Sequence, residues 1–308
     1  MSAEPAEPNI GPGRKITMLD KTYDRAAQDI GNSVGIGHVN VCIDDQHKAT
    51  HFYVSGLGYT RDPFLNTGAG NMWINAGMSQ FHLPMGKPEV VRGTTGLVMP
   101  DREALLKRLN RVKKALDGTK FQFRESNDGV ETVCPWGNRI TVHEPDPARF
   151  GRVQLGMPYV RFDVRPGTVE RIARFYREVV EAPAEVKKNG AGPEAKVQVG
   201  ENQYFYFRET DAPQPDYDGH HVQIYLSNFS RPYRKLLDLG LITVEDNDYQ
   251  YRFKDIIDLD TKEVLFSVEH ETRSVTNPMY GPPLINPNPP ASNMDYNPRN
   301  DSHPWGLP

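Results

Sequence analysis

The chain has 308 residues, with 36 lysines and arginines against 40 acidic residues and a formal net charge of -4 at pH 7. This length suits two domains or one large one, and the charge excludes the strongly basic footprint of proteins that bind nucleic acid or anionic membranes. Its two cysteines are too few for a disulfide framework, and no apolar run approaches the roughly 20 residues of a membrane-spanning helix, so we expect a cytoplasmic protein that acts on small molecules.

The chain begins with a polar, largely unpatterned stretch, residues 1–33, which we interpret as an N-terminal extension. Residues 36–43 then alternate between apolar and polar side chains, as a strand does, and residues 46–55 follow as a short amphipathic helix. Further strands, including 71–75 and 79–83, are predicted after a change of direction marked by glycine and proline. The order of elements in this unit is βαβββ.

The same order of elements returns three times. The second unit has strands at 94–99, 120–125, 130–134 and 138–143 and a helix at 101–116. The third has strands at 158–164, 184–188, 195–199 and 203–208 and a helix at 168–181, and the fourth has strands at 220–226, 242–244, 249–254 and 263–269 and a helix at 231–239. Four such units predict an α+β protein with a first domain at 34–145 and a second at 157–274. Residues 145–157, interrupted by prolines and glycines, are the expected linker.

The last residues, 275–308, are rich in proline, which cannot donate to the hydrogen-bond ladder of a helix or sheet. Apolar side chains such as Met279, Tyr280 and Trp305 have little use in a purely solvated terminus. Two interpretations of this tail stay open. It is either a solvated terminus or an extended strap across the protein body or a neighbouring subunit.

Features of the repeat resemble a known family. His38 lies in the first strand, and the end of the first helix carries Phe52, Tyr53, Leu57 and Gly58. With four βαβββ modules in tandem, residues 34–272 resemble the vicinal oxygen chelate superfamily, which includes glyoxalase I, bleomycin-resistance proteins and two-domain extradiol ring-cleaving dioxygenases. The resemblance implies that two modules form one cup-shaped sheet, with metal ligands on the first and last strands of each module. The length and layout are most similar to the extradiol dioxygenases, which implies Fe(II) or Mn(II) in the second domain.

The first-choice metal ligands are His221 and Glu269, in the second domain. Alternation puts His221, Gln223 and Tyr225 on one face of the fourth module's opening strand. Glu269 and Glu271 share one face of its closing strand. His221 and Glu269 occupy positions where the resemblance to extradiol dioxygenases implies a histidine and a glutamate.

The other ligand positions leave alternatives open. The resemblance implies a histidine at the start of the third module, where this chain has Pro158 and Tyr159. A metal-free pocket, with the fourth module's histidine and glutamate as a hydrogen-bonded pair, is therefore one alternative. Another is a site in the first domain, where His38 and His82 match glyoxalase-like ligand positions and His143 is a candidate for the third ligand.

Aromatic and charged side chains predict a polar pocket in the second domain. The predicted substrate-binding residues are Arg161, Tyr204, Tyr206, Arg208 and Gln223, and the candidate catalytic residues are Tyr159 and Tyr225. Tyrosines stack on oxygenated aromatic ligands and donate hydrogen bonds to them, and arginine pairs with carboxylates. A register shifted by one residue would turn Phe205 and Phe207 to the pocket instead.

Three functional hypotheses remain open. The first is a dioxygenase-like enzyme in which both hydroxyls of a catechol-like substrate chelate Fe(II) next to O2, as the resemblance implies. The second is a metal-free protein that sequesters an aromatic or anionic small molecule through Arg161, Tyr204 and Arg208. The third is a glyoxalase-like isomerase or lyase that uses His38 and His82. In each case we expect a small-molecule partner and no nucleic-acid or membrane partner, with a homo-oligomer left open.

Overall fold

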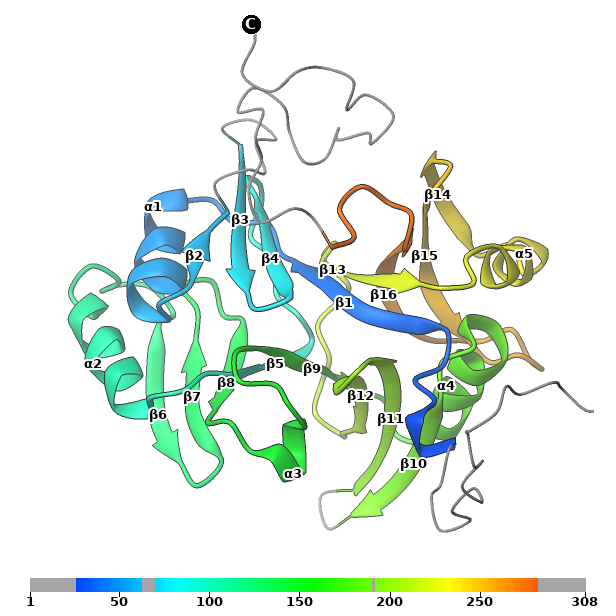
Figure 1. The fold of residues 1–308 in the computed structure, drawn as a ribbon, viewed down its shortest axis with the longest axis horizontal. Helices are drawn as coiled ribbons and strands as arrows, with labels where there is room; N and C mark the ends of the chain where they lie inside the picture. The colour runs from blue at the N-terminus through cyan, green and yellow to red at the C-terminus, as the bar shows by residue number, and fades with distance from the viewer. Residues whose placement is uncertain (1–25, 63–69, 190–191, 282–308) are drawn as a thin grey trace, which may run out of the picture.

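The computed structural model describes residues 26–62, 70–189 and 192–281 (Figure 1). The described chain forms two mixed sheets of eight strands each, with short helices packed beside them. This architecture confirms the predicted α+β class and the tandem βαβββ modules. No helix within these ranges is long and apolar enough to cross a membrane. The N-terminal extension up to residue 25 and the tail from residue 282 lie outside the described residues.

The modules follow one another in the predicted order. The first contains β1 (Ser33–Asn40), α1 (Gln46–Ala49), the π-helical segment η2 (Thr50–Gly56), β2 (Thr60–Arg61), β3 (Asn71–Ala76) and β4 (Ser79–Pro84). The second contains β5 (Gly93–Val98), α2 (Arg102–Val112), β6 (Gln122–Ser126), β7 (Gly129–Val133) and β8 (Arg139–His143). The third contains β9 (Gly156–Val164), α4 (Val169–Phe175), the π-helical segment η3 (Tyr176–Val180), β10 (Ala184–Asn189), β11 (Gly192–Gly200) and β12 (Gln203–Glu209). The fourth contains β13 (His221–Leu226), α5 (Ser230–Asp238), β14 (Ile242–Asn247), β15 (Gln250–Ile257) and β16 (Val264–Ser274).

Two short helices lie outside the modules. A turn of 3-10 helix, η1 (Ala26–Gln28), precedes the first module, and α3 (Pro147–Phe150) lies between the second and third. The segment 145–157, which was expected to link two domains, therefore contains a helix and leads directly into β9.

Each sheet combines two modules that the sequence analysis had assigned to different domains. Sheet 1 has the strand order β14-β15-β16-β13-β1-β4-β3-β2 and joins the first and fourth modules. Sheet 2 has the order β10-β11-β12-β9-β5-β8-β7-β6 and joins the second and third. The expected pairing of modules one with two and three with four is therefore wrong for the sheets. Every module offers the edge of its first strand to a partner, so local sequence patterns do not specify which partner it takes.

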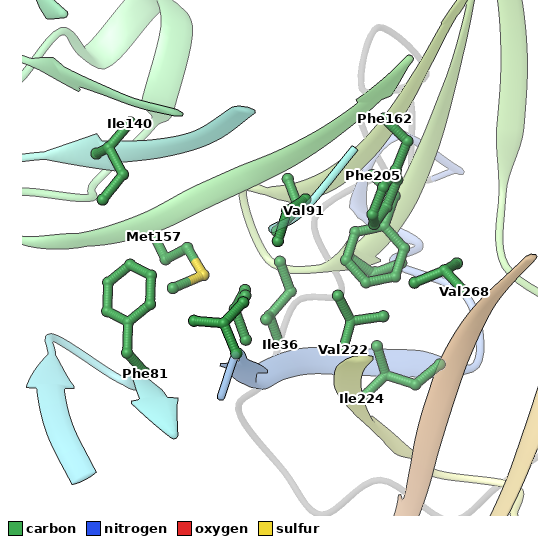
Figure 2. Packing of buried hydrophobic residues seen from close by; sticks show 14 of the residues in the cluster. Ile36, Phe81, Val91, Ile140, Met157, Phe162, Phe205, Val222, Ile224 and Val268 are labelled. Carbon is green, nitrogen blue, oxygen red and sulfur yellow. The ribbon is translucent and has the colours of Figure 1, made fainter. Parts of the chain in front are cut away.

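The two sheets share one hydrophobic core (Figure 2). Ile36, Val222 and Ile224 reach into it from sheet 1, and Phe162 and Phe205 reach into it from sheet 2. Each of these side chains is at most 2 % exposed, and burying a side chain of this size stabilises the fold by about 1.5–3 kcal/mol. Because side chains alternate along a strand, the polar residues between them lie on the opposite face of each sheet.

The helix α2 shows how local sequence sets an element. Leu105, Leu109 and Val112 are spaced to share one helix face, and all three are buried in the core. The Asp101 carboxylate accepts a hydrogen bond from the Ala104 amide at 2.9 Å and caps the start of the helix. The helix ends at Val112, four residues before the predicted end at 116, and turns follow it.

The first residues of the expected tail, 275–281, fold back against sheet 1 (Figure 1). The Val275 amide donates to the Leu226 carbonyl at 3.3 Å. The ring of Tyr280 meets that of Tyr225 with centroids 4.9 Å apart. This part of the tail therefore lies beside β13, the strand that carries His221.

Candidate metal centre

Three histidines from three strands converge on the polar face of sheet 1. His38 lies on β1, His82 on β4 and His221 on β13, and a ring nitrogen of each lies within 4.8 Å of the others. The Nε2 atoms of His38 and His221 are 3.3 Å apart. These two side chains are 1 % and 7 % exposed, so their imidazoles are shielded from solvent. The histidines considered for two separate domains thus form one histidine cluster.

The antiparallel pairing of β1 with β13 explains why the histidines meet. His38 and His221 each precede a valine, and these two valines lie opposite one another, so the strand pair has an approximate two-fold axis there. On the flanking strands, His82 and Glu271 each lie opposite the residue that follows the valine. The axis therefore makes His82 of β4 equivalent to Glu271 of β16.

Glu271 adds a carboxylate to the histidine cluster. Its Oε2 atom lies 3.5 Å from His221 Nε2 and 4.0 Å from His38 Nε2. Arg252 donates to the same oxygen at 2.6 Å, and Arg273 pairs with Oε1 at 2.5 Å. Burial by itself would raise the pKa of Glu271, but Arg273 and then His38 oppose it and hold this pKa well below its usual range. The carboxylate is therefore ionised beside the imidazoles.

Burial keeps the imidazoles of His38 and His82 neutral. It is the main cause that lowers the pKa of His38 well below its ordinary value, against the opposing charge of Glu271. Burial, followed by the charge of His221, lowers the pKa of His82 to about 3. A neutral imidazole carries a free lone pair, which is the form that binds a metal ion.

Neighbouring side chains orient His82. Its ring stacks on Trp73 with centroids 3.9 Å apart, and the Trp73 ring also meets His38 edge-on at 5.1 Å. The Nε2 atom of His82 lies 3.0 Å from the Oδ1 atom of Asn71. Two neighbours therefore fix the plane of this imidazole.

Glu269, the glutamate chosen from the sequence, lies behind His221. The two residues are direct neighbours across β13 and β16. The Oε1 atom of Glu269 lies 3.7 Å from Nδ1 of His221, whereas the Nε2 atom of the same ring faces the cluster. A carboxylate in this position orients the ring of a ligating histidine. The structure thus puts Glu271 beside the cluster, because Glu271 lies two residues further along the same face of β16.

The other predicted site residues divide between the two sheets. Gln223 and Tyr225 lie on β13 with His221. The residues on the polar face of sheet 2, across the shared core, are Tyr159, Arg161, Tyr204, Tyr206 and Arg208. The structure does not bring this second group together with the histidine cluster.

The polar face of sheet 2 is internally satisfied. Arg161 pairs with Glu194 at 3.0 Å, and Arg208 pairs with Asp163 at 2.6 Å. Phe205 and its neighbour two residues on point into the core, so the tyrosines of β12 take the opposite face. The predicted aromatic and charged lining therefore exists as one face, but its charged groups are paired with each other.

His143, the third ligand considered for the first domain, also lies in sheet 2. Its Nδ1 atom donates to the Asp128 carbonyl at 2.6 Å, and its Nε2 atom lies 2.9 Å from the hydroxyl of Tyr159. Both ring nitrogens are thus occupied by protein groups. His221 takes the place that had been considered for His143 beside His38 and His82.

Buried polar atoms without a partner gather near the histidine cluster. Among the described residues they include Asn40 Oδ1, Trp73 Nε1 and both amide atoms of Gln223. Each of these side chains is at most 4 % exposed. Buried polar groups in proteins are almost always satisfied, so these atoms point to a ligand or water that completes them.

Several residues at the centre were not singled out from the sequence. Trp73 and Asn71 were seen only as parts of a strand, and Arg252 and Arg273 were not considered. Glu271 was placed on the correct face of its strand but was not chosen. Alternation along β16 was the available signal for Glu271, and the arginines carry no comparable local signal.

Comparison with known proteins gives the fold. No family model matches the chain. An uncharacterised protein from Acanthamoeba polyphaga mimivirus is 34% identical over 59 residues, which are 18% of this chain and 48% of that protein. The chain thus spans about half the length of the curated relative that it matches.

Solved structures align over most of the chain. A proposed dioxygenase from Bacillus subtilis aligns with a TM-score of 0.52 and 16% identity, over 79% of this chain and 86% of that one. Glyoxalase I from Zea mays aligns with a TM-score of 0.52 and 12% identity, over 78% of this chain and 92% of that one. The chain has the vicinal oxygen chelate fold. Within this vicinal oxygen chelate fold, the histidine cluster lies on the first and last strands of its modules, where the resemblance implied ligands.

The donors in the cluster fit a divalent transition-metal ion. Neutral imidazole nitrogens and an ionised carboxylate are the ligands that iron, manganese and zinc sites use. His38, His82, His221 and Glu271 would hold the ion. The unpartnered polar atoms of Asn40, Trp73 and Gln223 would then border the bound ligand.

Proposed function

We propose that this chain is a metal-dependent enzyme for a small molecule that binds the metal through two adjacent oxygen atoms. The observation that carries the proposal is the convergence of three imidazoles and the ionised Glu271 on one shielded face. When bound, the ion would supply a Lewis acid that polarises the substrate oxygens. The vicinal oxygen chelate fold supports this proposal, since structures that share it include proteins named glyoxalase I and dioxygenase.

The number of protein donors bears on the type of reaction. A six-coordinate ion held by three imidazoles and one carboxylate has two positions left, and two adjacent substrate oxygens fill them. We therefore place an isomerase or lyase reaction first, because it needs no further small ligand.

Side chains around the cluster would bind and orient the substrate. The side-chain oxygen of Asn40, both amide atoms of Gln223 and the indole N–H of Trp73 are buried and unpartnered among the described residues. We assign the N–H groups of Gln223 and Trp73 hydrogen bonds to substrate oxygens, and the side-chain oxygens of Asn40 and Gln223 hydrogen bonds from substrate hydroxyls. Trp73 also covers one face of His82 and excludes water there. Glu269 keeps the His221 ring in its orientation from behind.

A dioxygenase of the extradiol type is the second candidate, favoured by the two arginines at Glu271. Arg252 and Arg273 both hold this carboxylate. If the Glu271 carboxylate stays with the two arginines and does not bind the ion, three imidazoles remain as ligands. A six-coordinate ion then has three open positions for a catechol-like substrate and O2. Fe(II) or Mn(II) would then be the expected ion.

Counting the open positions tests the proposal and separates the candidates. The full chain is loaded anaerobically with Fe(II), saturated with catechol or acetohydroxamate as a bidentate probe, and exposed to nitric oxide, which is read by electron paramagnetic resonance. With four protein donors, we expect the bidentate probe to exclude nitric oxide. A Glu271→Gln variant is expected to readmit it, because one donor is weakened.

The outcomes are distinct. A nitrosyl signal that persists with the probe bound favours the dioxygenase, and oxygen uptake with catechols then becomes the direct assay. A protein that takes up no Fe(II), Mn(II), Co(II) or Zn(II) refutes a metal-dependent enzyme and leaves the metal-free binding protein. Arg161→Ala, on the polar face of sheet 2, is the matched variant that should leave the nitrosyl signal unchanged.

A further inference from the structure

Arg273 is a buried arginine next to the proposed ligand Glu271. The two side chains are 5 % and 3 % exposed. Removing a guanidinium and a carboxylate from water costs several kcal/mol, and apolar replacements of such pairs are often as stable. The pair is therefore better explained by what it positions than by the stability that it contributes.

Each side of the Arg273 guanidinium has its own partner. Nη2 pairs with Glu271 Oε1 at 2.5 Å, and Nε donates to the Gln250 side-chain oxygen at 2.7 Å. Nη1 lies 3.1 Å from the sulfur of Met279. The partners come from β16, from β15 and from the segment that follows β16. Because a guanidinium is planar and rigid, three partners in different directions fix both its position and its plane.

The two oxygens of Glu271 have different surroundings. Oε1 faces Arg273 alone, whereas Oε2 faces His221 at 3.5 Å and His38 at 4.0 Å and also accepts a hydrogen bond from Arg252 at 2.6 Å. An arginine that holds Oε1 prevents the carboxylate from rotating about its last bond. Oε2 therefore stays directed at the imidazoles.

We propose that Arg273 is a positioning residue for the metal centre, which fixes Glu271 for the ion and is itself kept in place by Gln250 and Met279. This inference rests on the proposed function, since it requires a metal ion at the histidine cluster. The proposal also gives residues 275–281 a structural role in the metal centre. Met279 is 8 % exposed and held by a hydrogen bond from its own amide to the Asn277 side chain at 2.9 Å, so the segment supports the centre from the side of β13.

Sheet 2 offers a matched control for this arrangement. Asp163 is likewise held by two arginines, Arg139 and Arg208, each at 2.6 Å, and its side chain is 9 % exposed. Among the described residues, the one group of side chains that could hold a metal ion is the histidine cluster of sheet 1, and none lies beside Asp163. Loosening Asp163 therefore tests the effect of removing one arginine from a buried carboxylate away from the centre.

The experiment measures the affinity of the full chain for Co(II) by competition with a chromogenic chelator, together with the visible spectrum of the bound ion. The variants are Arg273→Gln, Arg273→Lys, Met279→Ala and the control Arg139→Gln. We expect Arg273→Gln to weaken binding about 10- to 100-fold, as for outer partners of metal ligands. Arg273→Lys should recover part of the affinity, since the ammonium keeps the charge without the planar fork. Met279→Ala should weaken binding less than Arg273→Gln and shift the spectrum in the same direction.

Circular dichroism establishes which variants fold. Wild-type affinity in folded Arg273→Gln overturns the inference, as does an equal loss of affinity in Arg139→Gln, which would indicate general loosening. If Arg273→Gln does not fold, wild-type affinity and spectrum in both Arg273→Lys and Met279→Ala overturn it. Wild-type protein that binds no Co(II) instead overturns the proposed function, so the two failures are distinguishable.

Discussion

Replacing His38 and His221 by alanine, singly and together, tests whether they belong to one centre. Their Nε2 atoms are 3.3 Å apart although the residues are 183 positions apart in the chain. If both hold the same ion, either single variant removes most of the binding, and the double variant loses little more. Two independent sites would instead give additive losses, with half of the metal retained in each single variant.

The expected size of the effect follows from binding linkage. A metal at 100 times its dissociation constant stabilises the folded state by about 2.7 kcal/mol. If the loss of one imidazole weakens binding about 100-fold, the same metal concentration contributes only about 0.4 kcal/mol. For a chain of this size the first figure corresponds to a rise in unfolding temperature of about 4 °C, and the second to about 0.6 °C.

The assay is calorimetric unfolding with and without Co(II) or Zn(II), each variant compared with its own metal-free form, alongside metal content by mass spectrometry. His143→Ala is the control, because that histidine lies in sheet 2 and its ring nitrogens are both occupied. A single variant whose unfolding temperature still rises by the full amount on addition of the metal would refute the shared centre.

Three further predictions concern the rest of the molecule. Burial, followed by the charge and hydrogen bond of Glu89, raises the pKa of Cys42 to about 11. Alkylation of Cys42 by iodoacetamide should therefore be slow at pH 8, become faster as the pH rises and the thiolate forms, and be faster in Glu89→Gln than in the wild type. Equal alkylation rates in the two proteins would count against this electrostatic cause. A methyl group at Gly96 would lie 2.2 Å from the Tyr159 ring. Gly96→Ala should therefore lower the free energy of unfolding, measured in urea, by about 1–3 kcal/mol without changing the metal content. An unchanged free energy of unfolding would contradict this packing. Phe207 is fully buried, so Phe207→Ala should lower the free energy of unfolding by about 3–5 kcal/mol in the same assay. A decrease of less than about 1 kcal/mol would contradict its place in the core.

Periodicity predicted the elements well because it reports which face of a strand is buried. The alternation that placed His221, Gln223 and Tyr225 on one face of a strand corresponds to β13 as the structure has it. The turn signals located the strands of each module to within a few residues. Alternation also drew attention to His221, whereas His38 and His82 were noticed because they match the ligand positions that the resemblance implied.

Long-range pairing is what the sequence patterns did not contain. His38 and His221 were assigned to different sites because neighbouring modules were paired in chain order. The choice of partner for β1 depends on how the core closes around Ile36 and Val222, which no local window records. The same holds for Arg252 and Arg273, whose roles become visible only when the carboxylates of β16 are in place beside them.

The nested pairing of the modules also sets the order of events during synthesis. Sheet 2 has all its strands once Glu209 has been made, whereas sheet 1 needs the chain up to Ser274. At translation rates of about 5–20 residues per second, β1 waits about 10–40 s for β13, with the edge that β13 will cover open to other strands. Ribosome-bound chains halted once Glu209 has left the exit tunnel, but before β13 has, are therefore expected to protect sheet 2 from protease while β1 stays accessible. That interval is when the nascent chain is most exposed to aggregation and most in need of a chaperone.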